Sequence, residues 1–250
     1  MQSFFSPLRG LFTLSPMLLL ALPSLFDPRA LRARSPELWL SLATLFVYTY
    51  FTSSFAYESW GWTTGPRHLT PLIPFLLLPL ALFLRSLPGA PWTGRDRACA
   101  WWQVVASGAA AGLIALSLLT TLAMTLVNYI SDTFTNALYQ VALPLALRGF
   151  LPHSWLSLAG VPNPWAALPG VLAALVAAGA CVAIIVRTLS PNRRVPALAV
   201  ATVVIASIST LHASVRPPAY RVAHEQQAAE FMTNVYVPRP HQPPPRLWSR

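Results

Sequence analysis

Long apolar runs are the feature that most constrains this chain. A helix needs about 20 predominantly apolar residues to cross the hydrocarbon core of a bilayer, and in lipid it satisfies its own backbone hydrogen bonds. The sequence contains about six runs of this kind, namely Leu11–Phe26, Leu38–Tyr57, Leu69–Leu84, Cys99–Val127, Trp165–Val186 and Val195–Ala213. We therefore predict an all-α fold, a polytopic membrane helix bundle with about six transmembrane helices.

The scarcity of charge supports this prediction. Only 10% of the 250 residues are charged, whereas a soluble domain has about 25%. The net charge is +10, and all 17 basic residues are arginine. In a soluble protein this balance would suggest a nucleic-acid partner. Here the arginines lie in short clusters between apolar runs, so the expected partner is the lipid bilayer and not nucleic acid.

The distribution of arginine predicts the orientation. Short cytoplasmic loops of membrane proteins are enriched in basic residues. Alternate loops contain, on one side, Arg29, Arg32, Arg34, Arg85, Arg95, Arg97, Arg187, Arg193 and Arg194, and on the other only Arg67 and Arg148. The first set is therefore expected to face the cytoplasm, and the N- and C-termini are expected to be external.

Two domains follow from this pattern, a transmembrane bundle over residues 1–213 and an external tail over residues 214–250. The tail is predicted to form a short helix at Tyr220–Tyr236 and then a proline-rich, disordered segment. Within the bundle, Phe134–Phe150 is predicted to be an external amphipathic helix in the membrane interface. The alternative is that it spans the membrane, which would reverse the orientation of everything after it.

The loop between the second and third apolar runs is the segment richest in side chains suited to binding a ligand. It contains Glu58, Trp60, Trp62, Arg67 and His68. Tryptophan faces stack on sugar rings, and the planar guanidinium of arginine suits a phosphate group. Together these residues would suit a glycan linked to a lipid phosphate, and they form the candidate substrate-binding site.

Ordinary structural roles compete with each of these assignments. Trp60 and Trp62 could be interface anchors, Arg67 could bind lipid headgroups or cap a helix, and His68 could be structural. Glu58 and Asp132 would form a base or metal site only if they meet, which the sequence leaves open. His153 and His212 stand alone in the sequence. No metal site is predicted, and neither a catalytic residue nor a cofactor is identified.

Several segments resemble one family of membrane enzymes. Ser6-Pro7-Leu8-Arg9-Gly10-Leu11-Phe12 is similar to a segment of bacterial GT-C-type membrane glycosyltransferases, which are related to the protein mannosyltransferases. Gly61-Trp62 with Gly65-Pro66-Arg67-His68-Leu69 resembles the family's Gly-Trp-Ser-x-Gly-Pro-Arg-Tyr-Leu loop. Asn136-Ala137-Leu138-Tyr139 with Leu143-Pro144-Leu145 resembles a later external segment. The similarity covers roughly residues 3–186.

The resemblance implies sugar transfer from a polyprenyl-phosphate donor at the external face of a bacterial inner membrane. His68 replaces the family's tyrosine and Ala137 its proline, and no segment matches the loop that holds its catalytic acid. The chain is thus expected to resemble the C-terminal half of such an enzyme and to be inactive alone: a fragment, a split gene product whose N-terminal half is encoded separately, or a paralogue without catalysis. A non-enzymatic scaffold or assembly subunit is the alternative, and a transporter is the third.

Cysteine labelling tests the predicted orientation. Cysteines introduced as Ser59→Cys and Ser249→Cys should react with an impermeant thiol reagent in intact cells, because both positions are expected to be external. Ser35→Cys, beside the first arginine cluster, should stay unlabelled. Labelling of the Ser35 variant alone would reverse the orientation.

Overall fold

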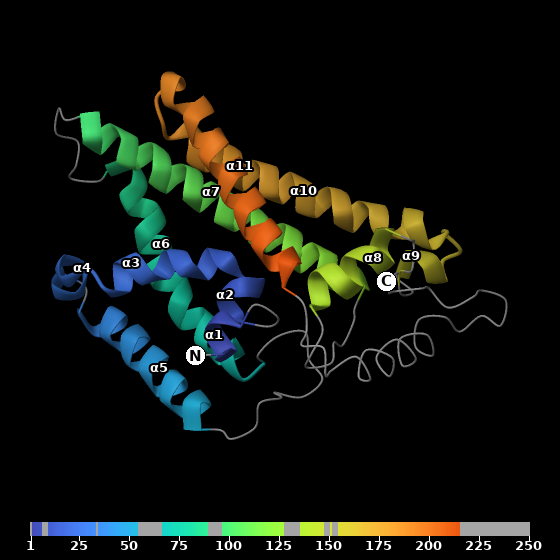
Figure 1. Cartoon of the computed structure of the whole chain (residues 1–250), viewed down its shortest axis with the longest axis horizontal. Coiled ribbons are helices and arrows are strands. Elements are labelled where there is room, and N and C mark those ends of the chain that lie inside the picture. Colours follow the sequence, from blue (N-terminus) through green and yellow to red (C-terminus); the bar gives the residue numbers. More distant parts are fainter. Residues whose placement is uncertain are drawn as a thin grey trace.

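Helices are the only regular elements in the described part of the chain. The computed structural model describes residues 2–6, 10–33, 35–54, 67–89, 97–127, 136–147, 151 and 155–215. Across these ranges the elements are α-, 3-10 and π-helices, with no strand, and Figure 1 shows the longer ones packed across one another. This confirms the predicted all-α fold. The predicted tail helix and proline-rich segment lie outside the described residues.

The helices differ widely in length, and 3-10 or π geometry occurs where the chain turns or contains proline. Their order along the chain is α1 (Gln2–Phe5), α2 (Leu11–Leu14), η1 (Pro16–Ala21, 3-10), α3 (Leu22–Leu25), α4 (Pro28–Ala33), α5 (Ser35–Ser54), η2 (Arg67–Leu72, 3-10), α6 (Ile73–Gly89), α7 (Arg97–Val127), η3 (Ala137–Ala142, π), α8 (Leu143–Leu147), α9 (Trp155–Leu158), α10 (Asn163–Arg187) and α11 (Pro191–Ser214).

Within the residues that the structure describes, four helical segments are long and apolar enough to cross a membrane. They are Leu69–Leu87 in η2 and α6, Trp101–Val127 in α7, Trp165–Arg187 in α10 and Pro191–Ser214 in α11. Their lengths of 19 to 27 residues correspond to roughly 28–40 Å of helix, against about 30 Å of hydrocarbon. Each matches one of the predicted runs, so the described chain is a polytopic membrane helix bundle.

The first two predicted runs take different forms. Leu11–Phe26 is divided among α2, η1 and α3, and its continuous apolar part is only Pro16–Leu25. Pro16 is the first residue of η1 and Pro23 the second residue of α3, positions that proline favours because it has no N–H to continue the preceding helix. The second run lies mostly within α5, which has 20 residues but is not one of these four candidate spans.

The broken first run lies inside the bundle. Leu18, Ala21 and Leu25 are almost completely buried. The backbone N–H of Met17, at the start of η1, donates to Ser117 Oγ on α7 at 2.8 Å. Ser117 Oγ in turn donates to the carbonyl oxygen of Leu113 at 2.9 Å. The first N–H groups of a helix have no partners within the helix. Ser117 supplies an acceptor for one of them in an apolar setting.

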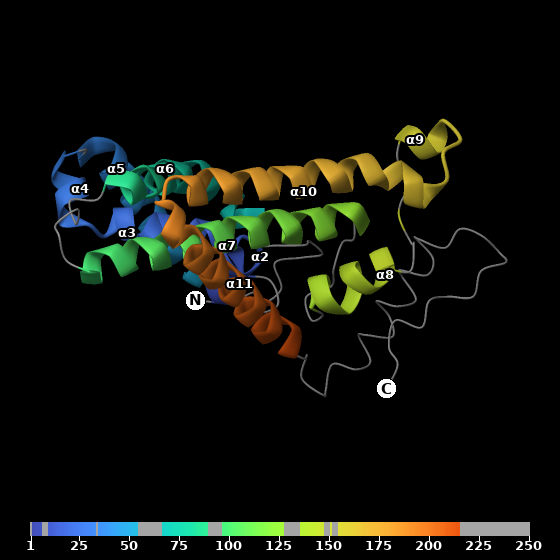
Figure 2. The same ribbon diagram turned by 90° about the horizontal axis from the view of Figure 1, so that it is seen from above.

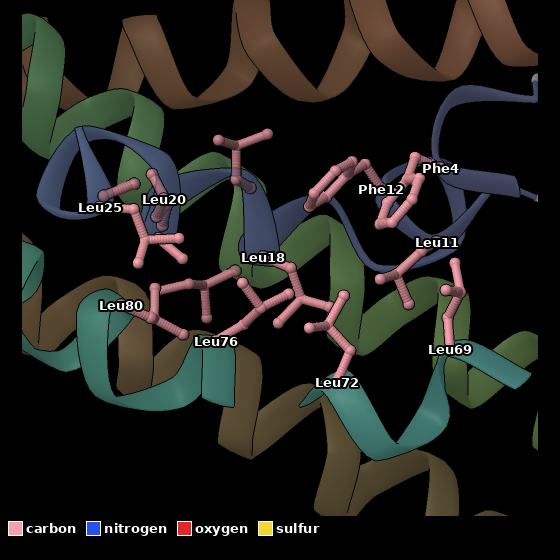
Figure 3. Packing of buried hydrophobic residues seen from close by; sticks show 14 of the residues in the cluster. Phe4, Leu11, Phe12, Leu18, Leu20, Leu25, Leu69, Leu72, Leu76 and Leu80 are labelled. Atoms are coloured by element: carbon pink, nitrogen blue, oxygen red, sulfur yellow. The ribbon is translucent and has the colours of Figure 1, made fainter. Parts of the chain in front are cut away.

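A leucine-rich layer joins this segment to η2 and α6. Figure 3 shows Leu18, Leu20 and Leu25 directed toward Leu72, Leu76 and Leu80 of the facing helix. Phe12 and Phe4 extend the same layer, with ring centroids 5.8 Å apart. The prolines of the run Leu69–Leu84 therefore lie in a helix that packs against its neighbours. In such a setting helix-breaking prolines are tolerated.

α7 is the central helix, and glycine lets α11 approach it closely. In the apolar window of α7, 56% of the residues are buried, against 11% in α10 and 17% in α11. A Cβ atom at Gly108 would lie 2.5 Å from the carbonyl oxygen of Ala197, and one at Gly112 would lie 2.8 Å from that of Ala201. Small residues four apart on both helices thus allow backbone-to-backbone packing.

The segment Phe134–Phe150 does not form one long helix in the described residues. It contains the six residues of η3 followed by the five of α8, from Ala137 to Leu147. Eleven helical residues are roughly half of what a bilayer requires. Figures 1 and 2 both show α8 beside the end of α7. This short helix is consistent with an interfacial position.

Most of the described arginines, with the exception of Arg67 in η2, gather toward one end of the bundle. Figures 1 and 2 place α4, the end of α6, the start of α7 and the α10–α11 turn toward the same side. Arg32, Arg85, Arg187, Arg193 and Arg194 belong to these elements. The ends of α5, α7 and α11 point the other way. Consecutive long helices of the described chain therefore run in alternating directions.

Adding one methyl group at the α7–α11 contact should destabilise the bundle. Gly108→Ala would press a Cβ against a backbone oxygen and the Val200 side chain, at 2.5 and 2.7 Å, so the helices must separate. We expect a loss of about 1–3 kcal/mol in unfolding free energy, measured by denaturant titration in detergent.

Gly179→Ala is the matched control, because no atom lies within 4 Å of a Cβ added there. It should be neutral or stabilise by up to about 1 kcal/mol through helix propensity. Equal effects of the two substitutions would contradict close packing at Gly108.

Candidate functional site

The predicted substrate-binding loop is only partly described. Glu58, Trp60 and Trp62 lie outside the described residues, as does Asp132. Arg67 and His68 are described as backbone, where they form the first turn of η2, while their side chains are not described. The clustering of the loop side chains therefore stays a prediction, and a meeting of Glu58 with Asp132, which the sequence left open, lies outside the described residues.

The backbone of η2 fixes where Arg67 and His68 emerge. Leu69 and Leu72 are completely buried in the leucine layer, so the turn is held against the bundle. Leu69 also begins the membrane-spanning segment that continues into α6. Arg67 therefore stands at the boundary between the loop and the apolar part of the helix, at the end of α6 opposite its connection to α7.

A buried polar cluster is the best-defined chemical group at that end of the described bundle. Asn136 is completely buried, and its Nδ2 donates to the carbonyl oxygen of His212 at 2.7 Å. Asn136 Oδ1 accepts the backbone N–H of Tyr139 at 3.2 Å. The rings of Tyr139 and His212 meet edge to face, with centroids 5.1 Å apart. One side chain thus joins segments 76 residues apart in sequence.

Local sequence explains this geometry. Asn136 has an extended backbone and occupies the N-cap of η3, a position where asparagine accepts from an N–H of the first turn. The carbonyl of His212 belongs to the last turn of α11, where it also accepts the backbone N–H of Val215 at 3.3 Å, so the Asn136 amide is a second donor to it. Single π turns are rare and are frequent at functional sites. The cluster therefore couples a helix end to an unusual turn.

The cluster is suited to holding η3 and the end of α11 in position. Its members present amide, phenol and imidazole groups around one contact. Groups of three or more metal-ligating side chains are absent from the described ranges. The sequence showed His212 as a lone histidine, whereas the fold brings it to Asn136 and Tyr139. The asparagine three residues before Tyr139 was the available signal, because it has N-cap spacing.

Comparisons with models of protein families, with curated proteins and with solved structures found no match. The fold by itself defines the class, an α-helical integral membrane protein with a central helix and a buried polar cluster near one end.

Removing the Asn136 side chain should loosen the end of α11. Asn136→Ala deletes two hydrogen bonds at a buried position, and lost buried partners cost about 1–3 kcal/mol. We expect a lower unfolding free energy, and faster amide exchange at the end of α11 and in η3. Asn192→Ala is the control, since that exposed side chain bonds only locally, to Ser190. Unchanged exchange in the Asn136 variant would refute the coupling.

Proposed function

We propose that this chain is a membrane part of a GT-C-like glycosyltransferase that uses a polyprenyl-phosphate-linked sugar. It would contribute a portion of the groove for the lipid phosphate and glycan. A separately encoded N-terminal half would supply the base that takes the proton of the acceptor hydroxyl as the sugar leaves the phosphate. The chain alone would then be inactive.

One observation carries this proposal. Two of the segments that resemble the family, around Arg67 and around Asn136, begin at the same end of the bundle, because α6 starts there and α7 ends there. The buried Asn136 ties the second segment to the end of α11. A groove that holds a lipid-linked sugar needs its phosphate-binding and glycan-binding loops at one membrane face.

The proposed orientation places this end outside the cell. The arginine-bearing ends of α4, α6 and α10 and the first turns of α7 and α11 would face the cytoplasm of a bacterial inner membrane, as basic loops generally do. The N- and C-termini would be external. Arg67 would then meet the carrier phosphate at the outer surface, with His68 beside it and Glu58, Trp60 and Trp62 contacting the sugar.

An assembly or scaffold role is the second candidate, and the surface of α10 is compatible with it. Only 11% of the apolar window of α10 is buried, and Leu172, Val176 and Ile184 are exposed along it. Such a face suits lipid or another membrane helix equally well. Sugar transfer by a complex of this chain with the proposed partner would favour the enzyme, and transfer that does not require this chain would favour the scaffold.

Substitution of Arg67 tests the proposed phosphate contact. If its guanidinium binds the carrier phosphate, Arg67→Lys should weaken binding of a polyprenyl-phosphate analogue, because lysine lacks the planar fork. Arg67→Ala should weaken it more, by about 1.5–3 kcal/mol or roughly ten- to a hundredfold in dissociation constant. Binding to the purified chain in detergent would be measured by calorimetry.

Arg148→Ala is the control, since Arg148 is also predicted to be external but lies in the amphipathic segment. Its replacement should have a smaller effect on the dissociation constant. Equal and small losses at both positions would indicate general attraction to anionic lipid, and the phosphate site at Arg67 would then be abandoned.

A further inference from the structure

The opposite end of the bundle contains an ordered pair of arginines. Arg193 and Arg194 lie in the first turn of α11, directly after the short turn that joins it to α10, and both are half-buried. Arg193 Nη1 donates to Gln103 Oε1 on α7 at 3.2 Å. Arg194 Nε donates to the carbonyl oxygen of Leu189 at 3.2 Å. Both guanidinium groups are therefore oriented by the protein itself.

These hydrogen bonds use only part of each guanidinium. An arginine has five N–H donors in a rigid planar fork, and the bonds described here occupy one donor on each. The remaining donors suit the paired oxygens of a phosphate, which arginine binds in bidentate geometry. Because the side chains are already restrained, little further conformational entropy is lost when an anion binds.

Tryptophans set the depth of this pair in the membrane. Trp101 and Trp102 are both 61% exposed and directly precede Gln103 on α7. Exposed tryptophans at helix ends lie at the level of lipid headgroups. The hydrogen bond between Arg193 and Gln103 places the first turn of α11 at that same level.

The charge around the pair has one sign in the described structure. Arg187, at the end of α10, is exposed and adds a third guanidinium near the turn. The described acids Asp27 and Glu37 lie beside α4 and in the first turn of α5, which Figure 1 shows well apart from the α10–α11 turn. In sequence, Arg95 and one acid, Asp96, directly precede Arg97, the first residue of α7.

We propose that Arg193 and Arg194, with Arg187 and the Trp101–Trp102 pair, form a binding site for the phosphate headgroup of an anionic phospholipid. The arginines would bind the phosphate oxygens, while the tryptophans contact the glycerol and upper acyl region. The site is independent of the proposed sugar transfer, because it lies at the other end of the bundle and uses different residues.

Lipid retention by the purified full-length chain tests this site. Mixed micelles would contain phosphatidylglycerol and phosphatidylcholine with identical acyl chains, and native mass spectrometry would count the lipid that remains bound. The wild-type chain should retain phosphatidylglycerol preferentially. The double variant Arg193→Gln/Arg194→Gln should bind it about tenfold or more weakly, as expected when charge-assisted contacts are lost.

The double variant Arg32→Gln/Arg85→Gln is the matched control. It removes two exposed charges from the same end of the bundle, so general electrostatic attraction falls equally while the proposed site stays intact. Its affinity for phosphatidylglycerol should change by no more than about twofold, the difference expected from screened surface charge. Equal losses in the two double variants would overturn the site.

A lysine double variant and a displacement measurement complete the test. Arg193→Lys/Arg194→Lys preserves charge, and its loss of affinity should be intermediate because the fork is gone; this variant replaces the glutamine variant if the latter unfolds in phosphatidylcholine micelles. Free glycerol 3-phosphate should fail to displace the bound lipid. Displacement by it, or equal retention of both lipids by the wild type, would show that the site is not one for an anionic lipid.

Discussion

The close approach of α7 and α11 at Gly108 and Gly112 is the interaction on which the rest of the bundle depends. Within lipid, the hydrophobic effect gives two apolar helices little reason to associate, so van der Waals contact between close backbones must supply the attraction. A Cβ at either glycine would collide with a carbonyl oxygen of α11. With α11 held on one side, α7 becomes the central helix against which α10 and η1 also pack.

A few polar contacts then hold the segments that do not cross as single long helices. The N–H of Met17 bonds to Ser117, which fixes the broken first run against α7. Asn136 bonds to the carbonyl of His212, which fixes the π turn against the end of α11. An unpaired polar group is costly in an apolar interior, so each bond favours one arrangement of its segment over alternatives with similar apolar packing.

The two ends of the bundle have different chemistry. One end has the ordered arginines of α11 beside the exposed tryptophans of α7. The other has the start of η2, where Arg67 emerges, and the Asn136 cluster. Between them, α10 and α11 present mainly apolar surface. Specific recognition in the described structure is therefore expected at the two membrane faces and not along the helices.

The sequence by itself determined the class of fold, because runs such as Trp165–Val186 and Cys99–Val127 are too long and apolar for anything but helices in a membrane. It did not show that Pro16–Leu25 would be a buried interior segment, since buried and lipid-facing leucines have the same composition. It also left His212 isolated, because its contact with Asn136 joins residues 76 positions apart. Gly108 and Gly112 have the spacing of a small-residue packing motif, but nothing in the sequence shows that their partner is α11. Only the tertiary structure decided which faces meet, because in lipid the choice rests on the fit of backbones and a few buried hydrogen bonds, which hydropathy does not encode.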